Sequence, residues 1–126
     1  MTIDTERFFE KHPAALPLYE TFEEQVLAAV PETRIRVQKT QISFGNPRLF
    51  ACVSFLPVRP AKERPAAYIV VTFGLDHRVE SPRIDAAVEP YPRRWTHHVL
   101  LAAPEEIDGQ LLAWVQEAAA FSAAKR

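Results

Sequence analysis

Apolar residues recur at helical spacing towards both ends of the chain. Between residues 16 and 30, apolar side chains mostly fall three or four positions apart, with glutamates on the opposite side. This spacing predicts an amphipathic helix of about four turns, which Pro31 ends because proline cannot continue the helical hydrogen bonding. A shorter helix is predicted at residues 5–11, stopped by Pro13. A C-terminal helix is predicted after Asp108, a residue type favoured at helix starts.

The middle of the chain carries the patterns of β-strands instead. Apolar and polar residues alternate over residues 34–38, and residues 68–73 are nearly all apolar, as in a central strand that Gly74 ends. Residues 57–65 are rich in proline and are predicted to form an exposed loop, while the prolines of residues 89–92 are incompatible with a sheet interior. The predicted strands are residues 34–38, 40–44, 49–56, 68–73, 84–88 and 95–102, with a turn at residues 45–48 that makes a β-hairpin of residues 40–56.

This order of elements predicts an α+β fold. Consecutive strands with short turns favour an antiparallel β-sheet, here of about four to six strands, with N-terminal and C-terminal helices packed on one face. We expect a single domain over residues 1–126, with its core at about residues 16–121. The opposite face of the sheet must then be solvated, covered by a partner, or used as a site.

Length and composition limit the possible classes of protein. The chain has 126 residues, of which 48% are hydrophobic and 25% charged, as is usual for a globular domain that folds without disulfides or metals. No apolar stretch approaches the ~20 residues of a membrane span, and the first ten residues lack a signal-peptide pattern. We therefore expect a cytoplasmic protein without a membrane partner. Cys52, the only cysteine, lies in an apolar run and is expected to be a buried, inert thiol.

Charge is distributed unevenly along the chain, although the net charge is only −1. Residues 1–32 contain seven acids and two bases, whereas residues 33–64 contain seven bases and one acid, which gives −5 and +6. Such asymmetry is typical of an anion-binding face. The alternative is internal complementarity, in which the acidic helix lies near the basic strands.

One candidate site lies in residues 38–44. If this stretch is extended, Lys39, Gln41 and Ser43 share one face and present an ammonium, an amide and a hydroxyl in a row. Such a row of donors suits an anion or the edge of a nucleic-acid base. The alternative is the ordinary polar side of an amphipathic strand.

A second candidate site is the stretch Arg93-Arg94-Trp95-Thr96-His97-His98. Adjacent strand residues point to opposite faces, so His97 and His98 are not expected to bind one metal together. One imidazole would be packed in the interior while the other could meet the Lys39 row. Histidine beside arginine and tryptophan suits a phosphate, a carboxylate or a stacked ring. The alternative is a pair of structural histidines beside a core tryptophan.

Three stretches resemble an uncharacterised bacterial family of domains of unknown function. They are residues 38–44, residues 68–75, and residues 88–98 with the His-His pair, and the resemblance covers about residues 16–121. That family includes small stand-alone proteins and C-terminal domains of some predicted transport- or restriction-type proteins. More distantly, the layout of the last strand and helix is similar to that of YjbR/MmcQ-like domains, some of which are described as DNA-binding. The resemblance implies a fold and a candidate surface, but no reaction.

The leading hypothesis is a non-enzymatic binding module for nucleic acid or an anionic small molecule. No catalytic residue, metal ligand or cofactor is predicted, because no GxSxG, HExxH or glycine-rich phosphate loop occurs. One alternative is a small enzyme with a histidine general base near Lys39, and another is a homodimerisation or protein-interaction domain. The candidate ligand-binding residues are Lys39, Gln41, Ser43, Arg48, Arg94, Trp95, His97 and His98.

Overall fold

A six-stranded antiparallel sheet forms the centre of the protein, in a computed structural model that describes residues 3–124. The strands are β1 (Arg34–Val37), β2 (Ile42–Gly45), β3 (Leu49–Ser54), β4 (Ile69–Leu75), β5 (Ala86–Tyr91) and β6 (Arg94–Leu101). Their order across the sheet is β1-β2-β3-β4-β6-β5, so the strand with the most apolar sequence, β4, lies in the interior as predicted. The α+β class predicted from the sequence is confirmed.

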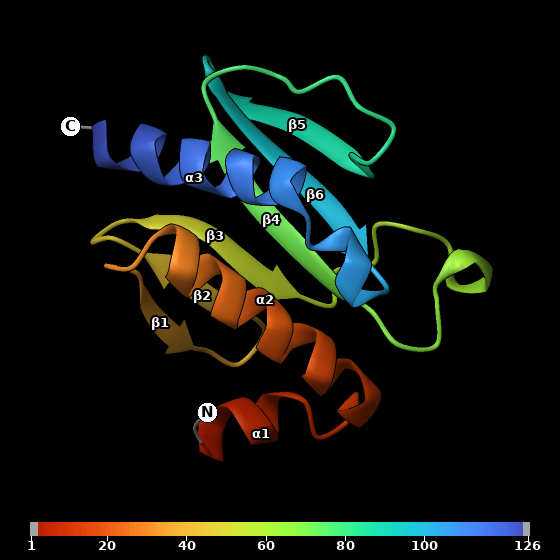
Figure 1. Ribbon diagram of the computed structural model, residues 1–126. Helices are drawn as coiled ribbons and strands as arrows, with labels where there is room; N and C mark the ends of the chain where they lie inside the picture. The colour runs from red at the N-terminus through yellow and green to blue at the C-terminus, as the bar shows by residue number, and fades with distance from the viewer. Residues whose placement is uncertain (1–2, 125–126) are drawn as a thin grey trace.

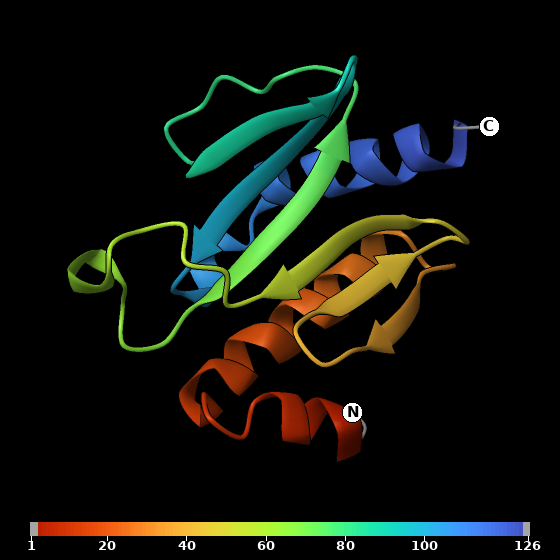
Figure 2. The same cartoon turned by 180° about the vertical axis from the view of Figure 1, so that it is seen from behind.

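The two long helices cover one face of the sheet and leave the other open. The helices are α1 (Ile3–Phe8), α2 (Leu16–Ala29) and α3 (Gly109–Ala124), with short 3-10 turns at Pro13–Ala15, Ala61–Glu63 and Pro104–Glu106. Helices α2 and α3 lie side by side in front of the strands (Figure 1). Seen from behind, the strands are uncovered, and α1 lies beside β1 at the lower end of this face (Figure 2).

The hydrophobic core fills the space between the sheet and the two long helices. Phe22 and Val26 of α2, and Leu111 and Val115 of α3, are completely buried. They meet alternate residues of the strands, of which Phe44, Ala51 and Phe73 lie side by side on β2, β3 and β4. Each fully buried phenylalanine or leucine stabilises the fold by roughly 1.5–3 kcal/mol. Packing against the helices therefore decides which face each strand residue occupies.

Residues 38–44 are not one extended strand, so the structure corrects this part of the sequence interpretation. The Gln38 N–H donates to the Gln41 carbonyl over 2.8 Å, and Lys39 and Thr40 form the tip of a tight turn between β1 and β2. A two-residue turn of this kind is the commonest way to join antiparallel strands. Strand β2 begins only at Ile42, and the predicted turn at residues 45–48 joins β2 to β3.

Two further boundaries differ from those predicted at β4 and β5. Gly74 does not end β4, because its backbone stays extended and pairs with Thr96 of β6. Strand β5 continues through Pro90, with a register shift between Val88 and Tyr91. This strand lies at the edge of the sheet, where proline is tolerated because one side of the strand needs no hydrogen-bond donors.

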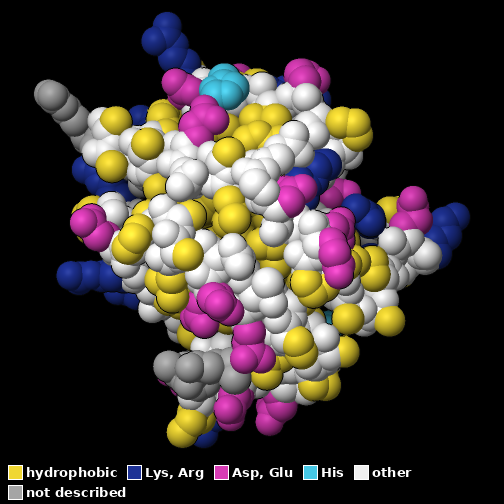
Figure 3. All heavy atoms as spheres, in the orientation of Figure 1, with side chains coloured by type: hydrophobic (Ala, Val, Ile, Leu, Met, Phe, Trp, Pro, Cys, Tyr) yellow, Lys and Arg dark blue, Asp and Glu magenta, His cyan; other side chains and the backbone are white. Residues whose placement is uncertain are grey.

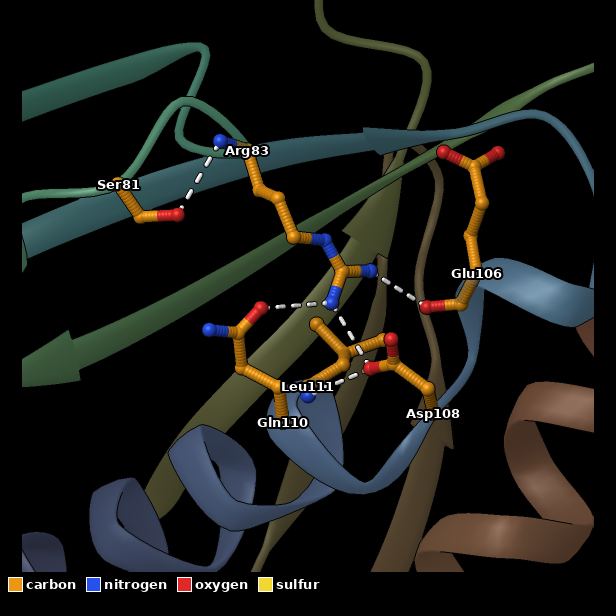
Figure 4. Close-up of polar contacts among 6 residues, drawn as sticks. All are labelled: Ser81, Arg83, Glu106, Asp108, Gln110 and Leu111. Carbon is orange, nitrogen blue, oxygen red and sulfur yellow. Dashed lines mark hydrogen bonds and ion pairs between the residues drawn. The ribbon is translucent and has the colours of Figure 1, made fainter.

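Arg83 ties the loop between β4 and β5 to the start of α3 (Figure 4). Its guanidinium donates to Asp108 Oδ1 over 2.8 Å, to Gln110 Oε1 over 3.1 Å and to the Glu106 carbonyl. Asp108 Oδ1 also accepts the Leu111 N–H, so Asp108 caps the helix as predicted. One arginine therefore fixes the loop and the helix start together.

None of the helices within residues 3–124 is both long enough and apolar enough to span a bilayer.

Arg83→Met is expected to lower the free energy of unfolding by roughly 1–3 kcal/mol, because it leaves acceptors at the start of α3 without their donor. Chemical denaturation followed by circular dichroism measures the change. Arg48→Met is the matched control: the Arg48 side chain is exposed and has no hydrogen bond or ion pair within residues 3–124, so a change within about 0.5 kcal/mol is expected. Equal effects of the two substitutions would contradict the conclusion that Arg83 fixes the loop and the start of α3 together.

Candidate functional site

A row of polar side chains crosses the open face of the sheet. Strand pairing places Ser43, Cys52, Thr72 and His98 directly beside one another on β2, β3, β4 and β6. Arg36 of β1 extends the row at one end. These residues alternate with the buried ones that meet the helices, so they all point to the uncovered face.

A hollow of about 660 Å³ lies over the middle of this row. Its floor is formed by the sheet, and its wall by the end of α1 and the segment that follows α1. The residues that line it are Arg7, Phe8, Glu10, Lys11, His12, Lys39, Thr40, Gln41, Cys52, Ser54, Phe55, Leu56, Thr72 and His98. We call this the His98 hollow.

Three side chains from neighbouring strands lie side by side on the floor of the His98 hollow. Thr72 Oγ1 lies 2.8 Å from His98 Nδ1, and Cys52 is the residue paired with Thr72 on its other side. Burial lowers the pKa of His98 and raises the pKa of Cys52, which favours a neutral imidazole and a protonated thiol. His98 Nε2 has no hydrogen-bond partner within residues 3–124 and is accessible to solvent, so it can meet a ligand.

His97 lies on the opposite face of the sheet and is completely buried. The Val79 N–H donates to His97 Nε2 over 2.9 Å, so this nitrogen carries no hydrogen and the ring is neutral. Burial lowers the pKa of His97 accordingly. Its ring stacks on Phe73 with the centroids 5.0 Å apart, which makes it part of the core.

Aromatic rings form one side of the His98 hollow. His12 stacks on Phe55 with ring centroids 4.0 Å apart, and Phe8 lies nearly parallel to Phe55 at 5.6 Å. All three line the hollow, and His12 is exposed. An exposed ring on such a stack is a surface on which a flat heteroaromatic group can stack.

A second hollow, of about 580 Å³, adjoins the first at Gln41 and extends over β1, β2 and the start of β3. We call it the arginine hollow, because Arg34 and Arg36 line it. Here Gln41 Nε2 donates to Ser43 Oγ over 2.9 Å, and Ser43 Oγ donates to Gln38 Oε1 over 2.6 Å. Gln41 and Ser43 of the predicted row therefore line this hollow together, whereas Lys39 does not, and the Ser43 hydroxyl is already bonded to Gln41 and Gln38.

The two hollows carry more positive than negative charge. Five cations line the two hollows, against one carboxylate, and they are Arg7, Lys11, Arg34, Arg36 and Lys39, with Glu10 as the acid. None of the five forms an ion pair within residues 3–124. Of the seven bases in residues 33–64, only Arg59 does so, with Asp85.

The alternative interpretation of the charge pattern required the acidic helix to lie near the basic strands. In the structure, the glutamates of α2 do not neutralise the arginines of β1. Glu20, Glu23 and Glu24 belong to α2, on the far side of the sheet from Arg34 and Arg36. Carboxylates are scattered over the apolar surface of the helix-covered side (Figure 3). The carboxylates of α2 and the arginines of β1 therefore lie on opposite sides of the sheet, whereas Asp4 and Glu10 of the acidic segment lie beside cations on the open side.

The structure brings together four of the eight residues predicted from the sequence. Lys39, Gln41, Ser43 and His98 line the two hollows. The other four do not join them. Arg48 is exposed in the turn after β2, Arg94 lies over the Phe121 ring, Arg78 lies over the Trp95 ring, and His97 is in the core.

Several residues of the hollows were not among those predicted. Arg34 and Arg36 alternate with the apolar residues Ile35 and Val37, so the strand pattern alone could have placed both arginines on the uncovered face. The contributions of Arg7, Lys11 and His12 had no such signal, because tertiary packing alone brings the segment around α1 to the sheet. Cys52 was expected to be buried, but it is only partly so and lies on the hollow floor.

The only grouping of metal-ligand residue types within residues 3–124 is exposed and lies outside the two hollows. Asp76, His77 and Glu117 place one ligand atom each within 4.8 Å of one another. His77 Nδ1 lies 2.7 Å from an Asp76 carboxylate oxygen, and its Nε2 lies 3.5 Å from Glu117. The imidazole hydrogen bond lowers the pKa of Asp76, so an ordinary surface ion-pair cluster explains this group.

Comparison with known families assigns the chain. The model of a family described as domain of unknown function (DUF5655) matches residues 5–122. The chain belongs to the DUF5655 family. This confirms the predicted resemblance to a family of unknown function, whereas the similarity to YjbR/MmcQ-like domains stays a prediction. For this DUF5655 domain, neither the curated proteins nor the solved structures give a match.

We expect His98 to take up its proton at a lower pH than an ordinary histidine, because the folded chain partly buries it. The unfolded chain then binds the proton first, so stability falls as the pH drops through the ordinary histidine range and below. Histidine-ring NMR over a pH series measures the pKa. His98→Gln should reduce the loss of stability between about pH 7.5 and 5.5 without removing it, because His97 contributes in the same direction. A His98 pKa at or above the ordinary value would contradict this account.

Proposed function

We propose that this protein is a binding module that holds single-stranded nucleic acid on its open sheet face. The observation that carries the proposal is the cation set of the two adjoining hollows. Five basic side chains from α1, the segment after it, β1 and the β1–β2 turn lie on one face, and none has an ion-pair partner within residues 3–124. Unpaired cations on one face are suited to a polyanion, because each phosphate contact releases condensed counterions.

The shape of the surface favours a single strand over a duplex. Two hollows that share Gln41 offer a continuous path across the sheet, with cations along it and exposed aromatic surface at one end. Proteins that bind single strands combine a basic groove with rings on which bases stack. A duplex buries its base faces and would leave the His12–Phe55 stack without a partner.

A second candidate function is a hydrolase in which His98 acts as general base. The specific observation in its favour is that Nε2 has no protein partner while Nδ1 is bonded to Thr72, within a hollow that Lys39 also lines. A base needs the tautomer with its hydrogen on Nδ1, whereas a phosphate ligand needs a hydrogen on Nε2. Incubating the protein with an oligonucleotide and following phosphorus NMR tests this candidate. New phosphomonoester signals that His98→Gln abolishes would support it, and an unchanged spectrum would discard it.

Arg36→Glu is expected to weaken binding of a short single-stranded oligonucleotide roughly tenfold at about 0.1 M salt and to make the salt dependence shallower by about one unit of slope. Lys62→Glu is the matched control. It makes the same charge change in the same basic segment, but Lys62 lies on the loop of residues 57–65 and lines neither hollow. We expect it to change affinity by less than about twofold. Fluorescence anisotropy over a salt series measures both variants.

Two results would overturn the proposal. One is wild-type binding that does not depend on salt, because phosphate contacts always give salt dependence. The other is an equal loss of affinity in the Arg36 and Lys62 variants, which would indicate a response to net charge and not to the open face.

A further inference from the structure

We propose that the His98 hollow is a site for one nucleotide, that is, a heteroaromatic base that bears a phosphate. This inference rests on the proposed function and deepens it. The ligand has two possible sources, a free mononucleotide or one nucleotide of a bound single strand, and both present the same chemistry to the hollow.

The size of the hollow fits such a ligand. Its volume of about 660 Å³ lies within the roughly 300–1,000 Å³ of small-molecule sites. The hollow is bounded by sheet on its floor and by the end of α1 on one side, and it is open to solvent elsewhere, so a ligand can enter without a rearrangement. The adjoining arginine hollow leaves room for a strand to continue beyond Gln41.

The lining contains three kinds of side chain, which match the phosphate, the base and the sugar of a nucleotide. They are exposed cations, stacked rings and the polar groups of the floor. Arg7, Lys11 and Lys39 are exposed cations that can hold a phosphate. The His12–Phe55 stack offers a ring on which a base can lie. A ligand with only one of these parts would leave the other groups of the hollow unused.

The floor supplies the polar groups that read a ribose or the edge of a base. Gln41, Ser54, Thr72 and His98 provide both donors and acceptors there. His98 is the best placed of them, because Thr72 fixes its ring through Nδ1 and leaves Nε2 accessible and unpaired within residues 3–124. Glu10, the one carboxylate of the hollow, can accept hydrogen bonds from a ribose hydroxyl or an exocyclic amine.

The test uses the full chain and titrates it, by amide NMR and calorimetry, with the four common nucleoside 5′-monophosphates, the matching nucleosides, inorganic phosphate and a short single-stranded oligonucleotide. We expect at least one monophosphate to bind at least roughly tenfold more tightly than its nucleoside or phosphate, with amide shifts concentrated around Lys39, Ser54, Thr72 and His98. His12→Ala removes the exposed ring of the stack and should weaken this binding fivefold or more. Because His12 is exposed, the variant is expected to fold, and its amide spectrum checks this.

Arg36→Glu provides the matched control, because Arg36 lines only the arginine hollow. It should leave monophosphate binding within about twofold while weakening oligonucleotide binding. Monophosphate binding without oligonucleotide binding would uphold this inference, with a free mononucleotide as the ligand, and overturn the proposed function. The oligonucleotide could instead bind while no monophosphate does. If its binding shifts amides of the His98 hollow and is weakened by His12→Ala, the result would uphold both proposals and assign the site to one nucleotide of a strand.

Three outcomes would overturn the inference. Oligonucleotide binding that shifts no amide around His98 would leave the proposed function standing and remove the nucleotide site. Phosphate that binds as tightly as every monophosphate would show a site for an anion only. No binding of any of these probes would remove both proposals.

Discussion

The rest of the structure depends on one constraint, the burial of a single face of the sheet. Helices α2 and α3 pack on that face alone, so the strands direct most of their large apolar side chains towards them, with Val70 and Leu100 as buried exceptions on the other face. Strand residues point alternately to the two faces, and the residues between the buried ones must therefore face outward. Ser43, Cys52, Thr72 and His98 lie in one row for this reason. Core packing thus assembles a polar floor from four strands, of which β4 and β6 are distant in sequence from the β2–β3 hairpin.

This constraint also explains how much the sequence could predict. Alternation and helical spacing identify the class of fold, the two long helices and the placement of His97 and His98 on opposite faces, because these features depend on local patterns. The turn at Lys39 was predicted as strand because residues 38–41 contain neither glycine nor asparagine, the residue types that mark most tight turns. The position of α1 beside the hollow depends on long-range packing, which no local pattern records.

Charge along the chain predicted less than the pattern of burial, because it does not show which charges are already paired. Arg59 belongs to the basic segment, yet its guanidinium bonds Asp85 over 2.7 Å. Arg94 lies over the Phe121 ring and is unsuited to reach a ligand in the hollows. Arg34 and Arg36 come from the same run of positive charge, but β1 presents them to solvent without partners within residues 3–124. A net charge summed over a segment counts all of its arginines equally, whereas the fold shows which of them are already paired and which are free to bind a ligand.

The floor and the rim of the His98 hollow differ in rigidity, and this difference shapes what the site can recognise. Asp85 accepts both the Arg59 guanidinium and the Leu100 N–H, each over 2.7 Å, and so holds β6 in place two residues from His98. Thr72 in turn orients the His98 ring. Lys11 and Lys39 on the rim are long, exposed side chains that lose conformational entropy when a ligand orders them. Such a rim attracts negative charge with little geometric selection, so discrimination between ligands must come from the fixed donors and acceptors of the floor.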